Sequence, residues 1–132
     1  QKWVWSPFLS VLGSGATAFV FNGRFSPETY LELLQKYQIN VLCCTPTEYR
    51  MMAKLQNLND YDLTHLHSAV SAGEPLNREV VEQFKKHFDL TVRDGYGQTE
   101  STLLIGFLKD TPQRSGSMGK GIPGSFVTVV DD

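Results

Sequence analysis

Short apolar runs alternate with amphipathic stretches along the first 93 residues, and this alternation constrains the fold more than any other feature. Four runs are typical of β-strands, at residues 17–21, 41–44, 68–71 and 90–93. The three stretches between these runs contain the apolar periodicity of helices. Repeated strand–helix units predict an α/β fold, with flanking helices and a mostly parallel sheet joined by right-handed crossovers.

Each predicted helix begins with a recognisable signal. Ser26 supplies an N-cap hydroxyl, and Pro27 and Glu28 suit the first helical turn. Residues 45–48 (TPTE) form a capping box with proline at the first helical position. A further helix is predicted from Asn77 to about residue 88, with glutamates near its start and basic residues at its end.

The pattern changes after residue 100. Residues 102–108 and 126–130 are predicted as β-rich, with a Gly/Pro/Ser-rich stretch between them. The chain also begins and ends beside apolar segments, which favours cuts through a larger fold. We therefore expect 1–132 to be a single fragment of a larger domain. About 1–100 would be an α/β subdomain, and about 101–132 the start of a β-rich region.

Charge and composition argue against several functions. A formal net charge of −2 provides no basic surface for nucleic acid or an anionic membrane. No apolar run approaches the length of a membrane span. Cys43 and Cys44 are adjacent in an apolar run, which predicts reduced thiols in a buried strand. A reducing, cytoplasmic setting is therefore expected.

Two polar motifs directly follow predicted strands. Residues 71–75 (SAGEP) follow the strand at 68–71, and residues 94–100 (DGYGQTE) follow the strand at 90–93. Ligands of parallel α/β sheets bind beyond the carboxyl ends of the strands. Strand order therefore predicts that the two motifs share one site.

The second motif has groups that suit a nucleotide and its metal ion. Gly95 and Gly97 flank Tyr96, so the backbone can take positive φ and approach a ligand closely, while the ring can face a purine. Thr99 offers a hydroxyl to a phosphate oxygen, and Glu100 offers a hard oxygen ligand to Mg²⁺. For each residue alone, the alternative is a strand-to-strand turn with a packed tyrosine and a solvated glutamate.

Three segments in order resemble a family signature. Residues 96–100 (YGQTE) resemble the core motif of the adenylate-forming enzymes: acyl- and aryl-CoA synthetases, luciferases and peptide-synthetase adenylation domains. SAGEP resembles their companion motif, and residues 119–131 look like the Gly/Pro turn and strand that follow. Gln98, the segment TPTEYRM at 45–51 and the region around Trp3 are most similar to the medium-chain acyl-CoA synthetases. The chain would be an internal fragment of the large N-terminal AMP-binding domain, whose α/β subdomain is flavodoxin-like.

The resemblance implies a two-step reaction of an acid–CoA ligase. The carboxylate of a fatty or other carboxylic acid attacks the α-phosphate of ATP, giving an acyl-adenylate and pyrophosphate. The thiol of CoA then displaces AMP to form a thioester, so ATP/AMP, Mg²⁺ and CoA are implied. Two alternatives remain: an adenylating enzyme that loads a carrier protein, and a non-catalytic flavodoxin-like module that binds a nucleotide or a protein partner.

The resemblance also implies roles for the motif residues. Tyr96 would stack on adenine, Thr99 would hold the α-phosphate, and Glu100 would bind Mg²⁺; the last two are the implied catalytic residues. The implied nucleotide-binding residues are Gly73, Glu74, Pro75, Asp94, Gly95, Tyr96, Gly97, Gln98 and Thr99. The implied acyl-pocket residues are Ala72, Gly97 and Trp3.

Parts of the family's machinery are not in this sequence. The Ser/Thr/Gly-rich phosphate loop, which ends in Pro-Lys, is expected upstream of Gln1. The aspartate that holds the ribose, the hinge and the lysine of the C-terminal domain are expected downstream of Asp132. We therefore expect these 132 residues to depend on the remainder of a parent synthetase and not to catalyse adenylation alone.

Overall fold

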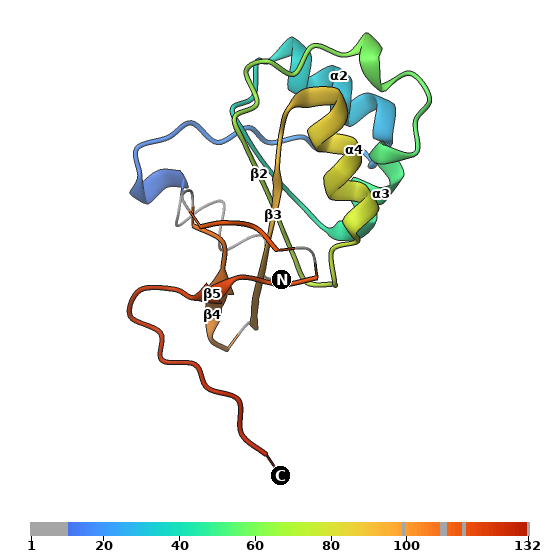
Figure 1. Ribbon diagram of the computed structural model, residues 1–132. Helices are drawn as coiled ribbons and strands as arrows, with labels where there is room; N and C mark the ends of the chain where they lie inside the picture. Colours follow the sequence, from blue (N-terminus) through green and yellow to red (C-terminus); the bar gives the residue numbers. More distant parts are fainter. Residues whose placement is uncertain (1–10, 99, 109–110, 115, 132) are drawn as a thin grey trace.

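The computed structural model describes residues 11–98, 100–108, 111–114 and 116–131. Within them, a five-stranded sheet packs against helices on one side (Figure 1). The helices are α2 (Pro27–Lys36), α3 (Pro46–Ala53), the 3-10 turn η2 (Leu58–Asp60) and α4 (Arg78–Phe88). The strands are β1 (Val41–Cys44), β2 (Ser68–Ala72), β3 (Val92–Gln98), β4 (Thr102–Gly106) and β5 (Lys120–Gly121).

The sheet is mixed, in the order β1-β2-β3-β4-β5. β1, β2 and β3 run parallel, whereas β3, β4 and β5 pair antiparallel. The α/β fold and its β-rich C-terminal end are therefore confirmed. The strand predicted at residues 17–21 is wrong, because this segment is irregular and lies outside the sheet. Its β-branched and aromatic residues suit a strand, but a strand also needs a hydrogen-bonding neighbour.

β3 extends past β2 at the carboxyl edge of the parallel strands. Ala72, the last residue of β2, is in register with Gly95, and β3 continues to Gln98. This extension pairs with β4, and its register shifts between Tyr96 and Gly97. Residues 94–98 are thus the last five residues of the seven-residue strand β3, and the prediction that they form a loop after residue 93 is wrong.

Local signals place the helices where they were expected. Ser26 Oγ accepts a hydrogen bond from the Thr29 N–H at the start of α2. The Thr45–Glu48 capping box at the start of α3 has both of its reciprocal bonds. Asn77 occupies the N-cap of α4 but makes no side-chain capping bond.

The helices cover one face of the sheet and bury the core there (Figure 1). Tyr49 of α3 and Phe84 of α4 are fully buried, with ring centroids 5.2 Å apart in an edge-to-face arrangement. The Tyr49 hydroxyl lies 3.2 Å from the Leu42 carbonyl oxygen and 3.3 Å from that of Val70. α3 is therefore tied to two neighbouring strands.

The opposite face of the sheet borders an open hollow of about 1300 Å³. Val41 and Cys43 of β1 are exposed there, and the segment before α2 forms another wall. Parallel sheets usually have both faces covered. In this chain, by contrast, the hollow leaves apolar surface of the parallel strands accessible.

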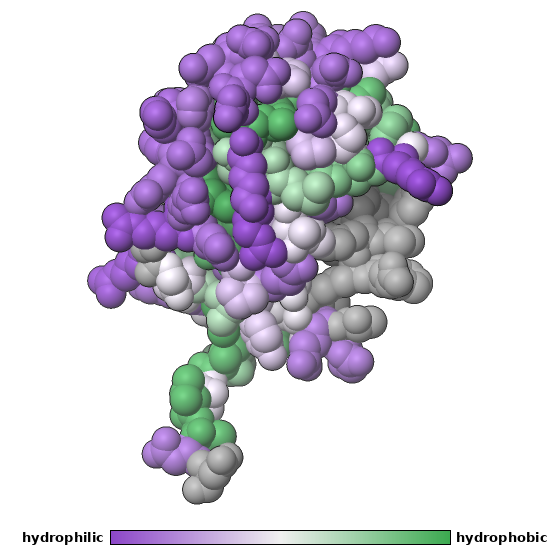
Figure 2. Space-filling model, turned by 90° about the vertical axis from the view of Figure 1, so that its right-hand side faces the viewer, coloured by the Kyte–Doolittle hydropathy of each residue, from purple (hydrophilic) through white to green (hydrophobic). Residues whose placement is uncertain are grey.

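The last residues leave the sheet as an extended tail. Phe126, Val129 and Val130 are 104%, 95% and 78% exposed, and Figure 2 shows this apolar tail projecting from the body. The strand predicted at residues 126–130 is wrong, because no strand is formed there. No helix in the described part of the chain is long and apolar enough to cross a membrane.

Candidate functional site

The two polar motifs lie side by side at the carboxyl edge of β2 and β3. Ala72 and Gly95 are register partners on these strands. Beyond β2 the chain turns, and the Leu76 N–H lies 3.4 Å from Asp94 Oδ2. One motif is therefore hydrogen-bonded to the segment that follows the other, as a shared site requires.

Glycine serves the two motifs for different physical reasons. Gly73 has φ of 104°, a conformation that side-chain-bearing residues rarely adopt, and it turns the chain out of β2. Gly95 lies in extended β3, so the expectation of positive φ there is wrong. A Cβ on Gly95 would lie 2.9 Å from Leu103 Cδ1. Gly95 therefore allows β4 to approach closely, and Gly97 also lies within β3.

Asp94 is a partly buried carboxylate between the motifs. Burial raises the pKa of its carboxyl group above the ordinary value, while hydrogen bonds from the Gly95 and Leu76 N–H groups oppose this shift. Its Oδ1 lies 2.8 Å from the Gly95 nitrogen. Because these bonds occupy both carboxylate oxygens, Asp94 ties β3 to the turn after β2.

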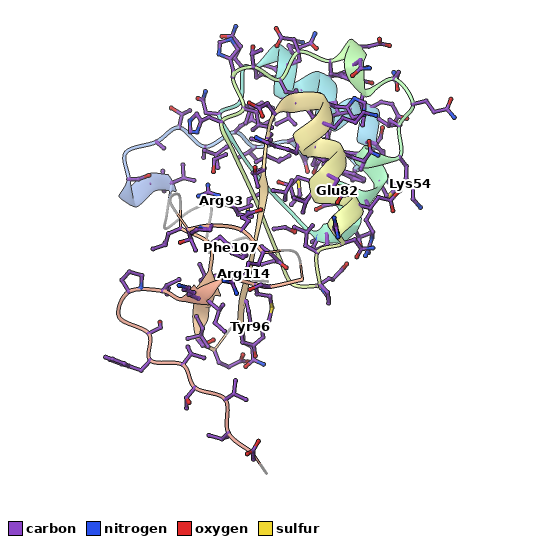
Figure 3. All side chains as sticks on the ribbon, in the orientation of Figure 1. Lys54, Glu82, Arg93, Tyr96, Phe107 and Arg114 are labelled. Carbon is purple, nitrogen blue, oxygen red and sulfur yellow. The ribbon has the colours of Figure 1, made fainter. Side chains whose placement is uncertain are left out.

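Three described side chains of the second motif are exposed. Tyr96 is 39% exposed, and Figure 3 places it toward the end of β3 that extends beyond the helices. Gln98 and Glu100 are also exposed, and the Gln98 N–H donates to Ser101 Oγ at 3.2 Å. Their side chains are thus accessible to a ligand at the sheet edge. Thr99 and Trp3, both predicted site residues, lie outside the described residues.

Glu74 has partners on α3 that the sequence analysis did not identify. Its Oε2 accepts hydrogen bonds from Thr47 Oγ1 at 2.6 Å and Arg50 Nη2 at 3.1 Å. Arg50 Nη2 also donates to Thr47 Oγ1 at 2.6 Å. One signal was available: both partners lie in the helix that follows β1, whose carboxyl end is at the same sheet edge.

The hollow connects this edge to an apolar surface. Ala72, Asp94, Gly95 and Gln98 contribute to its lining. Its other walls are mainly apolar and include Phe19, Phe21, Tyr30, Leu34, Val41 and Val70. Ala72 was predicted to border an acyl pocket, and it lies where the polar edge and the apolar walls meet. A ligand with one anionic and one apolar part would match this lining.

Metal-binding side chains and the two cysteines determine what chemistry the site can support. No group of three or more His, Cys, Asp or Glu side chains that could hold a metal ion is present among the described residues. Mg²⁺ commonly takes only one or two protein carboxylates and completes its shell with water and phosphate, so a single carboxylate such as Glu100 suits it. Cys43 and Cys44 are both free thiols, with Cys44 buried and Cys43 facing the hollow.

Comparison with protein families gives one match over nearly the whole chain. Residues 3–132 match the model of the AMP-binding enzymes. An uncharacterized acyl-CoA ligase of Bacillus subtilis strain 168, YtcI, is 69% identical over 132 residues. The mitochondrial acyl-coenzyme A synthetase ACSM3 of Rattus norvegicus is 40% identical, and 4-hydroxybutyrate–CoA ligase 1 of Metallosphaera sedula is 41% identical.

These alignments cover 99–100% of this chain but 25%, 23% and 23% of the three relatives. The chain thus spans about a quarter of the length of the curated relatives it matches.

Solved structures have the same arrangement of elements. The anthranilate CoA ligase AuaEII, determined in complex with anthranoyl-AMP, superposes with a TM-score of 0.83 at 28% identity. An acyl-CoA synthetase of Brucella canis superposes with a TM-score of 0.82 at 30% identity. Each match covers 89% of this chain, and 23% and 22% of the respective solved chains.

Proposed function

Because the chain belongs to the family of AMP-binding enzymes, we propose that it forms part of an acid–CoA ligase. The parent enzyme activates a carboxylic acid with ATP and transfers the acyl group to CoA, releasing AMP and pyrophosphate. The observation that carries this proposal is the pairing of β2 and β3, which puts both polar motifs at one sheet edge beside an apolar hollow. That edge suits a nucleotide, and the hollow suits an acyl chain.

Each part of the site has a distinct proposed role. The turn at residues 73–75 and the edge residues Asp94 and Gly95 flank adenine, and Tyr96 offers it a ring face. Gln98 belongs to the same nucleotide-binding set. Ala72 and Gly97 border the meeting point of the acyl carboxylate and the nucleotide, and Trp3 is a further proposed residue of the acyl pocket.

In the first step, the acid's carboxylate oxygen bonds to the α-phosphorus while the bond to pyrophosphate breaks. Thr99 would hold an α-phosphate oxygen and Glu100 would bind Mg²⁺, which offsets negative charge on the phosphorus centre. In the second step, the CoA sulfur bonds to the acyl carbon, AMP leaves, and the thiol gives up its proton. The protein contributes positioning and electrostatic stabilisation, without a covalent enzyme intermediate.

The names of similar proteins support a carboxylic acid as substrate. They include ligases of 4-hydroxybutyrate and of anthranilate, which are aliphatic and aromatic acids respectively. The hollow's apolar walls in this chain favour an acid with an apolar acyl part. We also propose a cytoplasmic setting, which the two free thiols favour.

A matched pair of variants in the full-length protein tests the nucleotide site. Tyr96→Ala removes the ring and Tyr96→Phe keeps it, so Ala should weaken AMP binding about tenfold and Phe should leave it near the starting value. AMP binding is measured by titration calorimetry, and AMP release is followed with a panel of carboxylic acids. No acid-dependent AMP release by the unaltered enzyme would refute the proposed reaction. Equal AMP binding by both variants would refute the stacking role.

We propose that the 132 residues alone are inactive, because they span only a quarter of their relatives' length. Acid-dependent exchange of pyrophosphate into ATP should be at background for the isolated chain and measurable for the full-length enzyme. Exchange by the isolated chain at a rate near that of the full-length enzyme would overturn this expectation.

A further inference from the structure

We propose that Arg50 and Thr47 of α3 neutralise the Glu74 carboxylate and hold it toward the helix, so that the turn at residues 73–75 presents uncharged backbone to the nucleotide. This inference rests on the proposed nucleotide site. It adds two positioning residues to that site and assigns Glu74 a role in which its charge is kept paired.

The contacts form a closed three-membered network. The Thr47 hydroxyl accepts from Arg50 and donates to Glu74, with both distances at 2.6 Å. The Arg50 guanidinium also reaches Glu74 Oε2 directly at 3.1 Å. One carboxylate oxygen therefore receives two hydrogen bonds from a single helix, and charge-assisted bonds of this kind are stronger than neutral ones.

The network joins a rigid element to a turn of special geometry. α3 begins with the Thr45–Glu48 capping box, and Tyr49 ties it to the sheet. Glu74 lies between Gly73, with φ of 104°, and a proline whose ring restricts the backbone. Fixing the Glu74 side chain on α3 therefore also restrains the turn proposed to flank adenine.

The Arg50–Glu74 ion pair would also lower the electrostatic repulsion between Glu74 and ATP. ATP is a polyanion, and an unpaired carboxylate within about 10 Å of it is only partly screened at physiological salt. Glu74 and Arg50 have side chains 43% and 36% exposed, so solvent weakens their attraction without removing it. Loss of Arg50 would leave Glu74 as an unpaired negative charge on the proposed adenine turn.

Arginine and glutamate variants of the full-length enzyme separate this role from a direct contact. Arg50→Ala should raise KM for ATP and the ATP dissociation constant about tenfold, with kcat and KM for the acid nearly unchanged. Arg50→Ala/Glu74→Gln removes both charges and should restore most of the affinity. Thr47→Val should give a smaller loss in the same direction. Lys85→Ala, which breaks the exposed Lys85–Asp89 pair on α4, is the matched control and should change neither constant.

The possible results distinguish charge compensation from direct contact of Arg50 with ATP. Rescue by the double variant supports charge compensation, whereas a double variant as weak as Arg50→Ala overturns it and favours direct contact of Arg50 with ATP. Calorimetric titration of ATP needs no turnover, so it tests the network even if no acid is activated. An unchanged ATP dissociation constant in Arg50→Ala overturns the proposed role of the network and leaves the proposed reaction standing. Absence of acid-dependent AMP release by the unaltered enzyme overturns the proposed reaction instead.

Discussion

Gly95 is closely packed against β4, because a Cβ there would lie 2.9 Å from Leu103 Cδ1 and 3.2 Å from the Ile105 carbonyl oxygen. Gly95→Ala should therefore displace the exposed Leu103 side chain and press on the Ile105 carbonyl oxygen, lowering the free energy of unfolding by about 1 kcal/mol. Urea unfolding followed by circular dichroism measures the change. Gly13→Ala is the control, since nothing lies within 4 Å of a Cβ at that position. A loss no larger than that of the control would show that the contact with β4 is unimportant.

The Cys44 thiol should be a poor nucleophile, because the residue is only 3% exposed. Burial is the main cause that raises its pKa, and the Glu48 carboxylate and the neighbouring Cys43 add to the shift. At pH 7.5 its thiolate fraction is therefore far below that of an unperturbed cysteine. Alkylation of Cys44 by iodoacetamide, followed by mass spectrometry, should be slow in the folded protein and fast in urea. Labelling at the free-cysteine rate under native conditions would contradict this.

The same shift makes stability depend on pH at the alkaline end. Because the folded pKa of Cys44 lies above the unfolded value of about 8.5, the folded state holds the thiol proton more tightly. The contribution is fully present below about pH 8.5 and is lost as pH rises toward the folded pKa. Cys44→Ala removes the titrating group, so the unfolding free energy of this variant should fall less steeply between about pH 8.5 and 10.5. Identical slopes for the two proteins would refute the assignment.

At the scale of elements, the helices that follow β1 and β2, α3 and α4, differ in how their N-termini are capped. The Thr45 side chain accepts from the Glu48 N–H, and Glu48 Oε2 accepts from the Thr45 N–H at 2.8 Å. Asn77 makes no equivalent side-chain bond. Thr45→Ala should cost about 1 kcal/mol of unfolding free energy and Asn77→Ala clearly less. Urea midpoints at constant m-value give the comparison, and equal losses would mean that the capping box is not what stabilises α3.

Elements with local signals could be predicted from the sequence, whereas elements that depend on a distant partner could not. Ser26, Thr45 and Pro46 determine where helices begin through bonds and backbone angles within a few residues. Residues 17–21 and 126–130 have strand-like composition but remain irregular, because strand formation depends on a neighbour that composition does not specify. Conversely, β5 is only Lys120–Gly121 and carries no apolar pattern, so pairing with β4 alone reveals it.

The same distinction applies to the candidate site: strand order could be predicted from the sequence, whereas contacts with distant partners could not. Strand order correctly put SAGEP and DGYGQTE at one edge, since parallel strands end there together. The extended conformation of residues 94–98 depends on β4, which pairs from further along the chain. The contacts of Glu74 with Thr47 and Arg50 span 27 and 24 residues and depend on helix orientation. Sequence spacing does not encode that orientation.

At the scale of the whole molecule, the structure divides into a well-packed side and an open side. The helices bury Leu31, Tyr49 and Phe84 completely on one face of the sheet. On the other side, the hollow of about 1300 Å³ and the extended tail leave apolar groups accessible. A single chain rarely keeps a large contiguous apolar surface in water. The accessible surface should therefore dominate the solution behaviour of these 132 residues.

The tail makes self-association of the 132-residue chain the expected behaviour. Residues 126–130 (FVTVV) have high β-propensity and no charge, and their unpaired backbone can add to another strand. Val129, 95% exposed, contributes no packing, so Val129→Lys should suppress association without altering the fold. Sedimentation velocity between about 5 and 100 μM measures the species present. Leu12→Lys adds the same charge at another exposed apolar residue and should leave association unchanged. A monomeric unaltered chain at every concentration, or equal suppression by both variants, would exclude the tail as the associating segment.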